Sequence, residues 1–300
     1  MDNPLILVVM PLYNAAPYVK KAVNSILTQT YSNFRLLVIN DGSTDTSRQE
    51  VDSVQDDRVV IWDQDNLGPG ASMNRALQYA DENKIPFIAR MDADDISAPT
   101  RLEVQLYLLE NNPSIAACSS NCYYIDNSTE AIIGSSTVPL SSNYIKWEIS
   151  NGLRGMIQGA TLFRTNSLHE IGGYRLQFKN AEETDLFLRL IERYELSNSK
   201  EFLYKIRLSN DSLSMQDVHR NVQYHFYAVE CSKNRKANKP EISFELFLRN
   251  MNRRVERRIL HEEYVLRLWR SYLVNRDYLS LIWVSLLDPR RLVARILRRI

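Results

Sequence analysis

The sequence predicts an α/β fold: a mostly parallel sheet with flanking helices, followed by a helical C-terminal extension. Apolar stretches of strand length alternate with amphipathic helical stretches over the first 120 residues. The pattern becomes entirely helical from about residue 216, and the charge balance reverses in the last fifty residues. We therefore expect two parts, an α/β domain over residues 1–212 and a helical, Arg-rich extension over residues 213–300.

The first strand and helix follow from apolar patterning. Residues 5–10 are an unbroken apolar run, typical of a strand that is covered on both faces. A helix is expected over residues 17–30, because Val19, Val23 and Leu27 recur at helical spacing and form one apolar stripe.

Three more strand–helix pairs follow. We expect strands at residues 34–39, 59–62 and 87–90, and helices over residues 46–54, 71–82 and 99–111. A polar turn ends the first of these strands, a Gly-Pro-Gly loop precedes the second helix, and proline opens the third. Ligands of such folds bind at the carboxyl ends of the strands.

The next part of the chain is less regular. Residues 115–208 predict short strands, a hairpin near residues 125–133 and two helices, the second of them over residues 182–194. We place the boundary with the helical extension near residues 208–214, where serine and asparagine gather.

Composition excludes several classes of protein. With 44% hydrophobic and 24% charged residues, the chain is not disordered, collagen-like or a disulfide scaffold. Its apolar runs are far shorter than the roughly 20 residues of a membrane-spanning helix. The first residues do not resemble a signal peptide, and three cysteines in such a chain predict free thiols in a reducing, cytoplasmic environment.

The strongest local signal is the sequence Asp92-Ala93-Asp94-Asp95, directly after the fourth strand. Three carboxylates in four residues repel one another unless a cation neutralises them. Oxygen ligands suit Mg²⁺ or Mn²⁺, which are often held by one or two carboxylates together with substrate phosphates. The alternative is that these residues cap the helix that begins near residue 99.

Five stretches carry a resemblance to a known family. They are VVMPLYN (8–14), VINDGSTD (38–45), NLGPGASMNRAL (66–77), RMDADDISAPTRL (90–102), and GGYR (172–175) followed by AEETDLFLRL (181–190). Because these stretches occur in the order typical of the family, the chain resembles the family 2 glycosyltransferases of the GT-A (Rossmann-like) fold over about two-thirds of its length.

The resemblance implies a nucleotide-sugar site with a divalent cation. Tyr13 would pack on the base and Asp41 would accept a hydrogen bond from it. Of the DxD motif, Asp94 would bind the metal directly, while Asp92 would face the ribose or the metal shell. The implied donor-binding residues are Pro11, Tyr13, Asn14, Asp41, Asn66, Gly68, Arg75, Asp92 and Ala93, and the implied ligands of Mn²⁺ or Mg²⁺ are Asp94 and Asp92.

The resemblance also implies a general base at the start of the helix over residues 182–194. Where the family usually has Glu-Asp, this sequence has Glu182-Glu183, so Glu183 inherits the role of the aspartate. Its side chain is one methylene longer, and a base must reach within about 2.6–3.2 Å of the hydroxyl that it deprotonates. Glu182 and Asp185 therefore stay open as alternatives. A histidine frequent in the family between residues 155 and 163 is also missing.

The implied function is an inverting, metal-dependent glycosyltransferase of bacterial surface polysaccharide or lipopolysaccharide synthesis. It would move a sugar from a nucleotide-diphosphate donor to a carbohydrate or lipid-linked glycan acceptor. A nucleotidyltransferase or nicotinamide dehydrogenase is disfavoured, because Pro11-Leu12-Tyr13-Asn14 is not a glycine-rich phosphate loop. The alternative function is a catalytically degenerate nucleotide-sugar-binding or scaffold protein.

The C-terminal charge suggests a further partner. Residues 1–248 carry 24 Lys and Arg against 31 Asp and Glu, whereas residues 249–300 carry 13 Arg against 5 Asp and Glu. Residues 288–300 read as a basic amphipathic helix with an apolar arc of about 140°. Such a helix fits adsorption to an anionic membrane at the inner face of the plasma membrane. Packing onto the acidic domain or in a homodimer is the alternative, and the apolar arc disfavours nucleic-acid binding.

Overall fold

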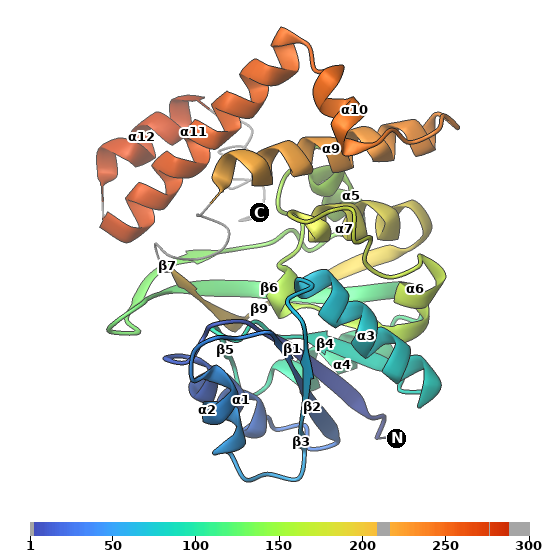
Figure 1. Cartoon of the computed structure of the whole chain (residues 1–300), viewed down its shortest axis with the longest axis vertical. Coiled ribbons are helices and arrows are strands. Elements are labelled where there is room, and N and C mark those ends of the chain that lie inside the picture. The colour runs from blue at the N-terminus through green and yellow to red at the C-terminus, as the bar shows by residue number, and fades with distance from the viewer. Residues whose placement is uncertain (1–2, 209–216, 276, 288–300) are drawn as a thin grey trace.

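The computed structural model describes residues 3–208, 217–275 and 277–287, and it contains a mixed sheet with helices on both faces (Figure 1). The strands are β1 (Ile6–Leu12), β2 (Phe34–Asp41), β3 (Val59–Gln64), β4 (Phe87–Arg90), β5 (Ile96–Ser97), β6 (Ile115–Asp126), β7 (Ile132–Ser136), β8 (Leu162–Arg164) and β9 (Glu195–Leu208). Their order in the sheet is β3-β2-β1-β4-β8-β6-β9-β5, and β7 pairs with β6.

The first half of the sheet confirms the predicted strand–helix alternation. Strands β3, β2, β1 and β4 are parallel, and each is followed by a helix close to the expected position. These helices are α1 (Val19–Leu27), α2 (Ser47–Asp52), α3 (Pro69–Glu82) and α4 (Arg101–Glu110). The polar turns after these strands therefore lie along one edge of the sheet.

Alternate side chains of the parallel strands enter two different cores. Leu7 and Val9 of β1 join a cluster with α3 and α7, whereas Ile6, Val8 and Met10 join a cluster with α1 and α4. All five side chains are buried, as expected for a strand with helices on both faces. This double burial explains why the apolar run of β1 is unbroken.

The second half of the sheet is mixed. Strands β6 and β9 run in the same direction as the first four strands, whereas β5, β7 and β8 are antiparallel to them, so the expected mostly parallel sheet is confirmed. Strand β8 runs antiparallel between β4 and β6, while β9 is parallel to β6 and antiparallel to the short β5. The expected hairpin near residues 125–133 is the β6–β7 connection. The tight turn between β6 and β7 has no crossover helix, so β7 returns antiparallel to β6. Strand β8 is reached through α5 and enters the sheet antiparallel to both of its neighbours.

Three helices, rather than the two expected, lie between β7 and β9. They are α5 (Ser142–Ser150), α6 (Thr165–Glu170) and α7 (Glu182–Arg193). Helix α7 begins and ends within one residue of the expected range. It bears the carboxylates singled out in the sequence, and α5 and α7 lie between the sheet and the C-terminal helices (Figure 1).

The C-terminal part is helical, as predicted. It contains α9 (Val218–Lys236), α10 (Phe244–Arg249), α11 (Arg253–Asn275) and α12 (Tyr278–Leu287). Aromatic side chains of α9 and α10, Tyr224, Tyr227, Phe244 and Phe247, belong to the same buried cluster as Leu7 of β1. The boundary at residues 212/213 and the amphipathic helix at residues 288–300 lie outside the described residues. Among the helices that are described, none is long and apolar enough to span a membrane.

Candidate active site

The carboxylate of Asp41 organises the side of the site where the sequence predicts nucleotide binding. Asp41 is the last residue of β2 and is buried, and its two oxygens accept hydrogen bonds from the backbone amides of Leu67 (2.9 Å) and Gly68 (2.8 Å). Gly42 has a φ of +73°, and a Cβ there would lie 3.0 Å from the backbone nitrogen of Asn66. The structure thus brings Asp41, Asn66 and Gly68 together, as the sequence predicted.

The loop after β1 is fastened to the turn after β2. The Asn14 side-chain oxygen accepts a hydrogen bond from the Thr44 amide (2.8 Å), and the Asn14 amide donates to Ser43 Oγ (3.1 Å). Asn14 has a φ of 48°, a left-handed conformation that asparagine tolerates. Tyr13 directly before it is exposed and follows Pro11 and Leu12 at the end of β1. This places the tyrosine ring where a ligand at the strand ends can reach it.

Arg75 joins this group only indirectly. Its guanidinium lies over the Trp62 ring, 4.8 Å from the centroid, and donates to the carbonyl oxygen of Asp63 (2.9 Å). It also approaches Gln64 Oε1 (3.4 Å), and Gln64 in turn donates to the Asp41 carboxylate (2.7 Å). Arg75 therefore supports the end of β3, and its side chain is exposed.

Asp92 is held from three sides by residues that sequence reasoning did not single out. Arg90 Nε and Nη2 donate to Asp92 Oδ1 at 3.1 and 3.0 Å, and the Asp92 amide donates to the hydroxyl of the buried Tyr204 (3.0 Å). A Cβ at Gly159 would lie 2.5 Å from Asp92 Oδ2 and 2.7 Å from the Tyr204 hydroxyl. Position 159 therefore has no room for a side chain. An arginine at the end of a fully buried strand was the one signal in the sequence that could have found Arg90.

The rest of the acidic turn is buried and crowded. Burial and the neighbouring Asp92 raise the pKa of Asp94 to about 6. Burial and Asp94 raise the pKa of Asp95 well above its usual value, and Asp95 accepts a hydrogen bond from the Arg207 amide (2.8 Å). Ala93, which stands between Asp92 and Asp94 in the sequence, is buried. Asp95 thus has a structural role, whereas Asp94 pairs with no basic side chain among the described residues.

These residues fit a divalent cation. The described part of the chain contains no group of three or more His, Cys, Asp or Glu side chains arranged around one point. Asp92 and Asp94 nevertheless provide two carboxylates, a set that Mg²⁺ and Mn²⁺ complete with substrate phosphates. The crowding that raises the pKa of Asp94 is relieved when a cation neutralises the pair.

The first turn of α7 faces the acidic turn. Burial raises the pKa of Glu182, with Arg90 opposing this effect and Asp92 adding to it. Burial and the adjacent Glu182 raise the pKa of Glu183 to about 7, against the lowering effects of Arg90 and Arg154. The charge of Arg90, which is hydrogen-bonded to Asp92 in the turn after β4, therefore also acts on the carboxylates of α7. These two segments are about 90 residues apart in sequence and form one site.

Asp185 has different surroundings from its neighbours in α7. It is fully buried, and its carboxylate accepts hydrogen bonds from Arg189 Nε (2.8 Å) and Arg175 Nε (2.9 Å). Arg175 also pairs with Glu241 (2.7 Å) beyond the end of α9. The bonds from Arg189 Nε and Arg175 Nε both end on Asp185 Oδ2, and Arg175 Nη2 donates to Oδ1. With both oxygens bound by arginines, Asp185 anchors α7.

We expect the substitution Asp185→Asn to destabilise the protein by about 3–5 kcal/mol, because it leaves the buried Arg189 guanidinium without its counter-charge. Urea denaturation followed by circular dichroism measures this loss. Glu182→Gln serves as the control, since its carboxylate forms no ion pair in the described part of the chain. Equal stability of the Asp185 and Glu182 variants would contradict the anchoring role.

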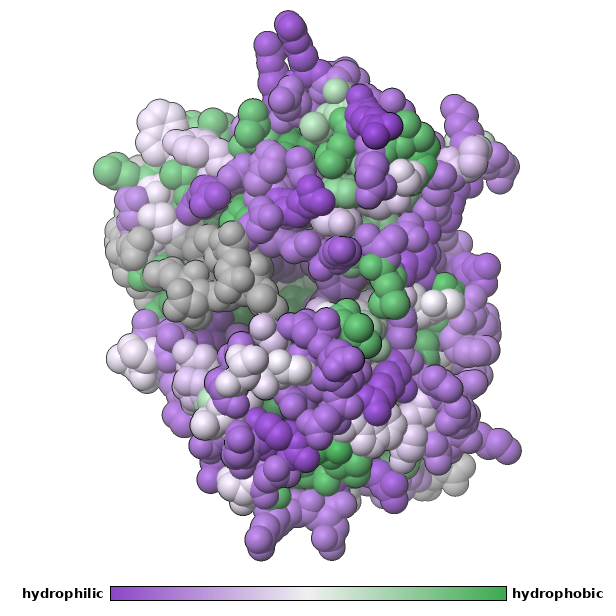
Figure 2. All heavy atoms as spheres, in the orientation of Figure 1, coloured by the Kyte–Doolittle hydropathy of each residue, from purple (hydrophilic) through white to green (hydrophobic). Residues whose placement is uncertain are grey.

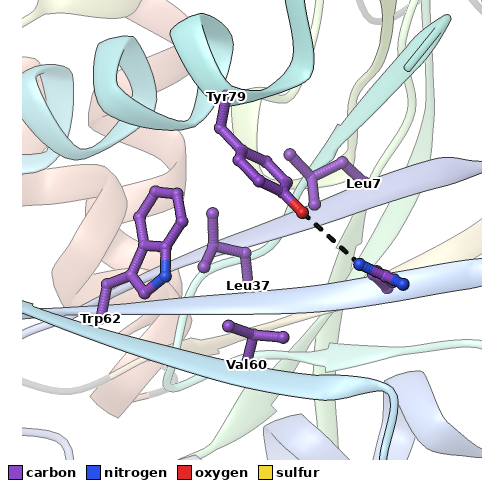
Figure 3. A pocket seen from close by; sticks show the side chains of 6 residues that line it. Leu7, Leu37, Val60, Trp62 and Tyr79 are labelled. Atoms are coloured by element: carbon purple, nitrogen blue, oxygen red, sulfur yellow. Dashed lines mark hydrogen bonds between the residues drawn. The ribbon is translucent and has the colours of Figure 1, made fainter. Parts of the chain in front are cut away.

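A shallow pocket elsewhere on the sheet lies away from this site. It is lined by Leu7, Arg35, Leu37, Val60, Trp62 and Tyr79 (Figure 3). Arg35, Leu7 and Val60 are each the second residue of their strand, so the pocket lies toward the amino ends of the strands. The candidate active site lies at their carboxyl ends.

Comparison with known proteins agrees with this geometry. The family model for glycosyl transferase family 2 matches residues 7–183. The chain is 30% identical to the UDP-Glc:alpha-D-GlcNAc-diphosphoundecaprenol beta-1,3-glucosyltransferase of Escherichia coli over 71% of this chain and 81% of that protein. It is 28% identical to the chondroitin synthase of Pasteurella multocida over 77% of this chain but only 23% of that protein.

Solved structures share the fold at low sequence identity. Staphylococcus aureus TarS 1-349 in complex with UDP superposes with a TM-score of 0.56 at 16% identity, covering 90% of this chain and 83% of that one. The mannosyltransferase PcManGT of Pyrobaculum calidifontis, in complex with GDP-Man and Mn²⁺, gives 0.57 at 17% identity over 93% and 74%.

Proposed function

Because the chain belongs to glycosyl transferase family 2 and is a glycosyltransferase, we propose that it is an inverting enzyme that depends on a divalent cation. It transfers a sugar from a nucleotide-diphosphate donor to a hydroxyl of a glycan acceptor. The proposal is supported by Arg90, which donates hydrogen bonds to Asp92 after β4 and whose charge lowers the pKa of Glu182 and Glu183 at the start of α7.

The donor side of the proposed reaction uses the strand ends. Tyr13 stacks on the base, and Asp41 holds the 66–68 loop that closes the nucleotide pocket. Asp92 and Asp94 hold the cation, which when bound neutralises the charge that develops on the leaving diphosphate. Arg90 fixes the orientation of Asp92 through two hydrogen bonds.

The acceptor side uses α7. Glu183 removes the proton of the acceptor hydroxyl while that oxygen attacks the anomeric carbon of the sugar. The bond to the diphosphate breaks on the opposite face, so a single displacement inverts the anomeric centre. A pKa near 7 suits a general base at neutral pH. The charges of Arg90 and Asp92 both act on the pKa of Glu182, and Asp185 is paired with arginines. Glu183 is therefore the best-suited base of the three.

We propose surface-glycan assembly in a bacterium as the setting, with a carbohydrate or lipid-linked glycan as acceptor. The support is the likeness to the E. coli glucosyltransferase, whose name specifies a diphosphoundecaprenol-linked acceptor. The competing function is a catalytically degenerate scaffold that binds nucleotide sugars, suggested by the glutamate at position 183 where the family usually has aspartate.

Slow donor hydrolysis distinguishes the two functions. We expect the protein to hydrolyse at least one nucleotide-diphosphate sugar from a panel of UDP-, GDP- and dTDP-sugars in the presence of Mn²⁺ or Mg²⁺, and not in the presence of a chelator. Binding of a donor without hydrolysis or transfer would favour the scaffold.

We further propose that the protein acts on the cytoplasmic side of the plasma membrane and adsorbs to anionic lipid through its C-terminal helices. Leu279, Trp283 and Leu286 of α12 are 68%, 53% and 68% exposed, and their spacing places them on one face of the helix. The neighbouring α11 exposes four arginines in its first two turns, Arg253, Arg254, Arg257 and Arg258. Figure 2 shows apolar and polar side chains side by side over this part of the molecule, at the top of the view.

The double substitution of Leu279 and Trp283 by serine is expected to weaken binding to vesicles of anionic phospholipid at least tenfold, because it removes the apolar part of the contact. Co-sedimentation at low and at physiological salt measures the binding, which should fall with salt. The matched control replaces the exposed Tyr107 and Leu140 by serine. If the unsubstituted protein does not bind these vesicles at low salt, α12 is a packing or dimer surface. The same holds if the only effect of the double substitution is the dissociation of a dimer.

A further inference from the structure

Helix α9 runs parallel to α7 and contacts it at regular intervals. Among the hydrogen bonds that join α9 to α7 or to the residues that lead into α7, three have nearly the same sequence separation. They are Asn180 Nδ2 to Asn221 Oδ1 (2.5 Å), Thr184 Oγ1 with His225 Nδ1 (3.1 Å), and Ser232 Oγ to Glu192 Oε1 (2.8 Å). The partners are 41, 41 and 40 residues apart in sequence, so the two helices keep one register from the start of α7 to its end.

The far end of this contact is an ion-pair cluster. Arg235 of α9 pairs with Glu192 (3.0 Å) and Glu241 (2.7 Å) and lies 4.0 Å from Asp185. Since Asp185 is itself bound by Arg189 from α7, α9 is attached to the same anchor that fixes α7.

The start of α7 needs such support. Its N-cap residue is Ala181, which has a φ of 53° and no side-chain hydrogen bond to the free amides of the first turn. An alanine at this position lacks the side-chain hydrogen bond with which serine, threonine, aspartate or asparagine stabilises the start of a helix. The first turn therefore depends on contacts from other elements for its position.

The contact that reaches this turn is made by His225. It binds Thr184, the residue directly after Glu183. On its other side, a Cβ at Gly152 would lie 2.7 Å from His225 Nε2, so the loop after α5 packs closely against the ring. The imidazole is thus confined between this loop and the first turn of α7.

We infer that α9 is a component of the active site and that His225 is a positioning residue for the general base Glu183, acting through Thr184. The inference rests on the proposed function, because it concerns the base of that reaction. Displacing a reacting group by about 1 Å can cost a factor of 100 in rate. Donor binding depends on Asp41, Asp92 and Asp94 at the sheet edge, which α9 does not hold in place.

The test compares two histidines of α9. His225→Phe removes the hydrogen bond to Thr184. We expect it to lower kcat for sugar transfer 10- to 100-fold while KM for the donor changes less than twofold. His225→Asn keeps a side-chain nitrogen or oxygen near the position of Nδ1 and is expected to recover most of the rate. The matched control is His219→Phe, which removes the contact of α9 with Glu263 of α11 (2.9 Å) and should leave kcat unchanged.

Thr184→Val removes the same hydrogen bond from the α7 side and keeps the test decisive if the His225→Phe protein does not fold. It should reproduce the loss of kcat. A kcat within twofold of the unsubstituted protein in His225→Phe or Thr184→Val, or an equal loss in His219→Phe, would overturn the inference. If the proposed function itself is wrong, the result is different: the unsubstituted protein shows no transfer, or Glu183→Gln is fully active.

Discussion

Replacing Glu183 by glutamine is expected to lower the rate of sugar transfer by a factor of roughly 10²–10⁴, the usual contribution of a general base. Glutamine has the size of glutamate but cannot accept the acceptor's proton. Affinity for the donor should be retained, because the residues proposed to bind the donor lie on the turns that follow β1, β2 and β4. Steady-state transfer kinetics and calorimetric titration with a nucleoside diphosphate measure the two quantities.

The pH dependence of the reaction supplies an independent check. Burial and Glu182 raise the pKa of Glu183 to about 7, so the base is protonated and inactive at low pH. Transfer should therefore increase as the pH rises through about 7, and this rise should disappear in Glu183→Gln. Glu182→Gln is the matched control: it removes a like charge, should lower the pKa of Glu183, and should move the rise to lower pH. An active Glu183→Gln variant with the original pH profile would assign the base elsewhere.

Replacing Asp94 by alanine is expected to abolish the part of donor binding that depends on a divalent cation, while the fold stays intact. Asp94 has no basic partner among the described side chains, so its removal breaks no ion pair of the fold. Calorimetry with a nucleoside diphosphate, in the presence and absence of Mn²⁺, measures the effect. Because burial and Asp92 raise the pKa of Asp94 to about 6, cation-dependent binding by the unsubstituted protein should also weaken as the pH falls through about 6.

Asp95→Asn is the control for this prediction, since it changes a carboxylate in the same turn. An asparagine oxygen can still accept the hydrogen bond from the Arg207 amide, so cation-dependent binding should persist. Unchanged dependence on Mn²⁺ in Asp94→Ala would remove Asp94 from the metal site. Loss of cation dependence in Asp95→Asn but not in Asp94→Ala would transfer the role to Asp95.

Local patterning was enough to locate most elements of the first half of the fold. Strand β4 lies at the residues expected for it, and helix α7 lies within one residue of its expected range. Both elements are buried, and their apolar residues follow the pattern typical of a strand or of a helix. The motifs likewise placed Asp41, Asp92 and Glu183 at element ends, because turn and strand-end residues are visible in a single stretch of sequence.

The residues that hold the site residues in place could not be found from local patterns in the sequence. Tyr204 contacts Asp92 across 112 residues, and Arg207 reaches Asp95 across the same separation. Gly159 and His225 read as ordinary loop and helix residues in the sequence. Their roles depend on which segments become neighbours, and no local period encodes that choice.

Asp185 illustrates the same limit at a single position. Among the three carboxylates at the start of α7, the sequence offered no way to separate a base from an anchor. In the fold, residues at successive positions of a helix point in directions about 100° apart. Glu183 therefore faces the site with Arg90, whereas Asp185 faces Arg175 and Arg189.

The sequence alone therefore settled the α/β class, the four parallel strands and the family, because apolar periodicity and turn motifs are local properties of the chain. The antiparallel insertion of β8 between β4 and β6, the anchoring of Asp185 and the contact of α9 with α7 came only from the folded chain. Each of these depends on pairing between distant segments, and many such pairings are compatible with the same local pattern. The energy that selects one of them is the burial and hydrogen bonding of the assembled core.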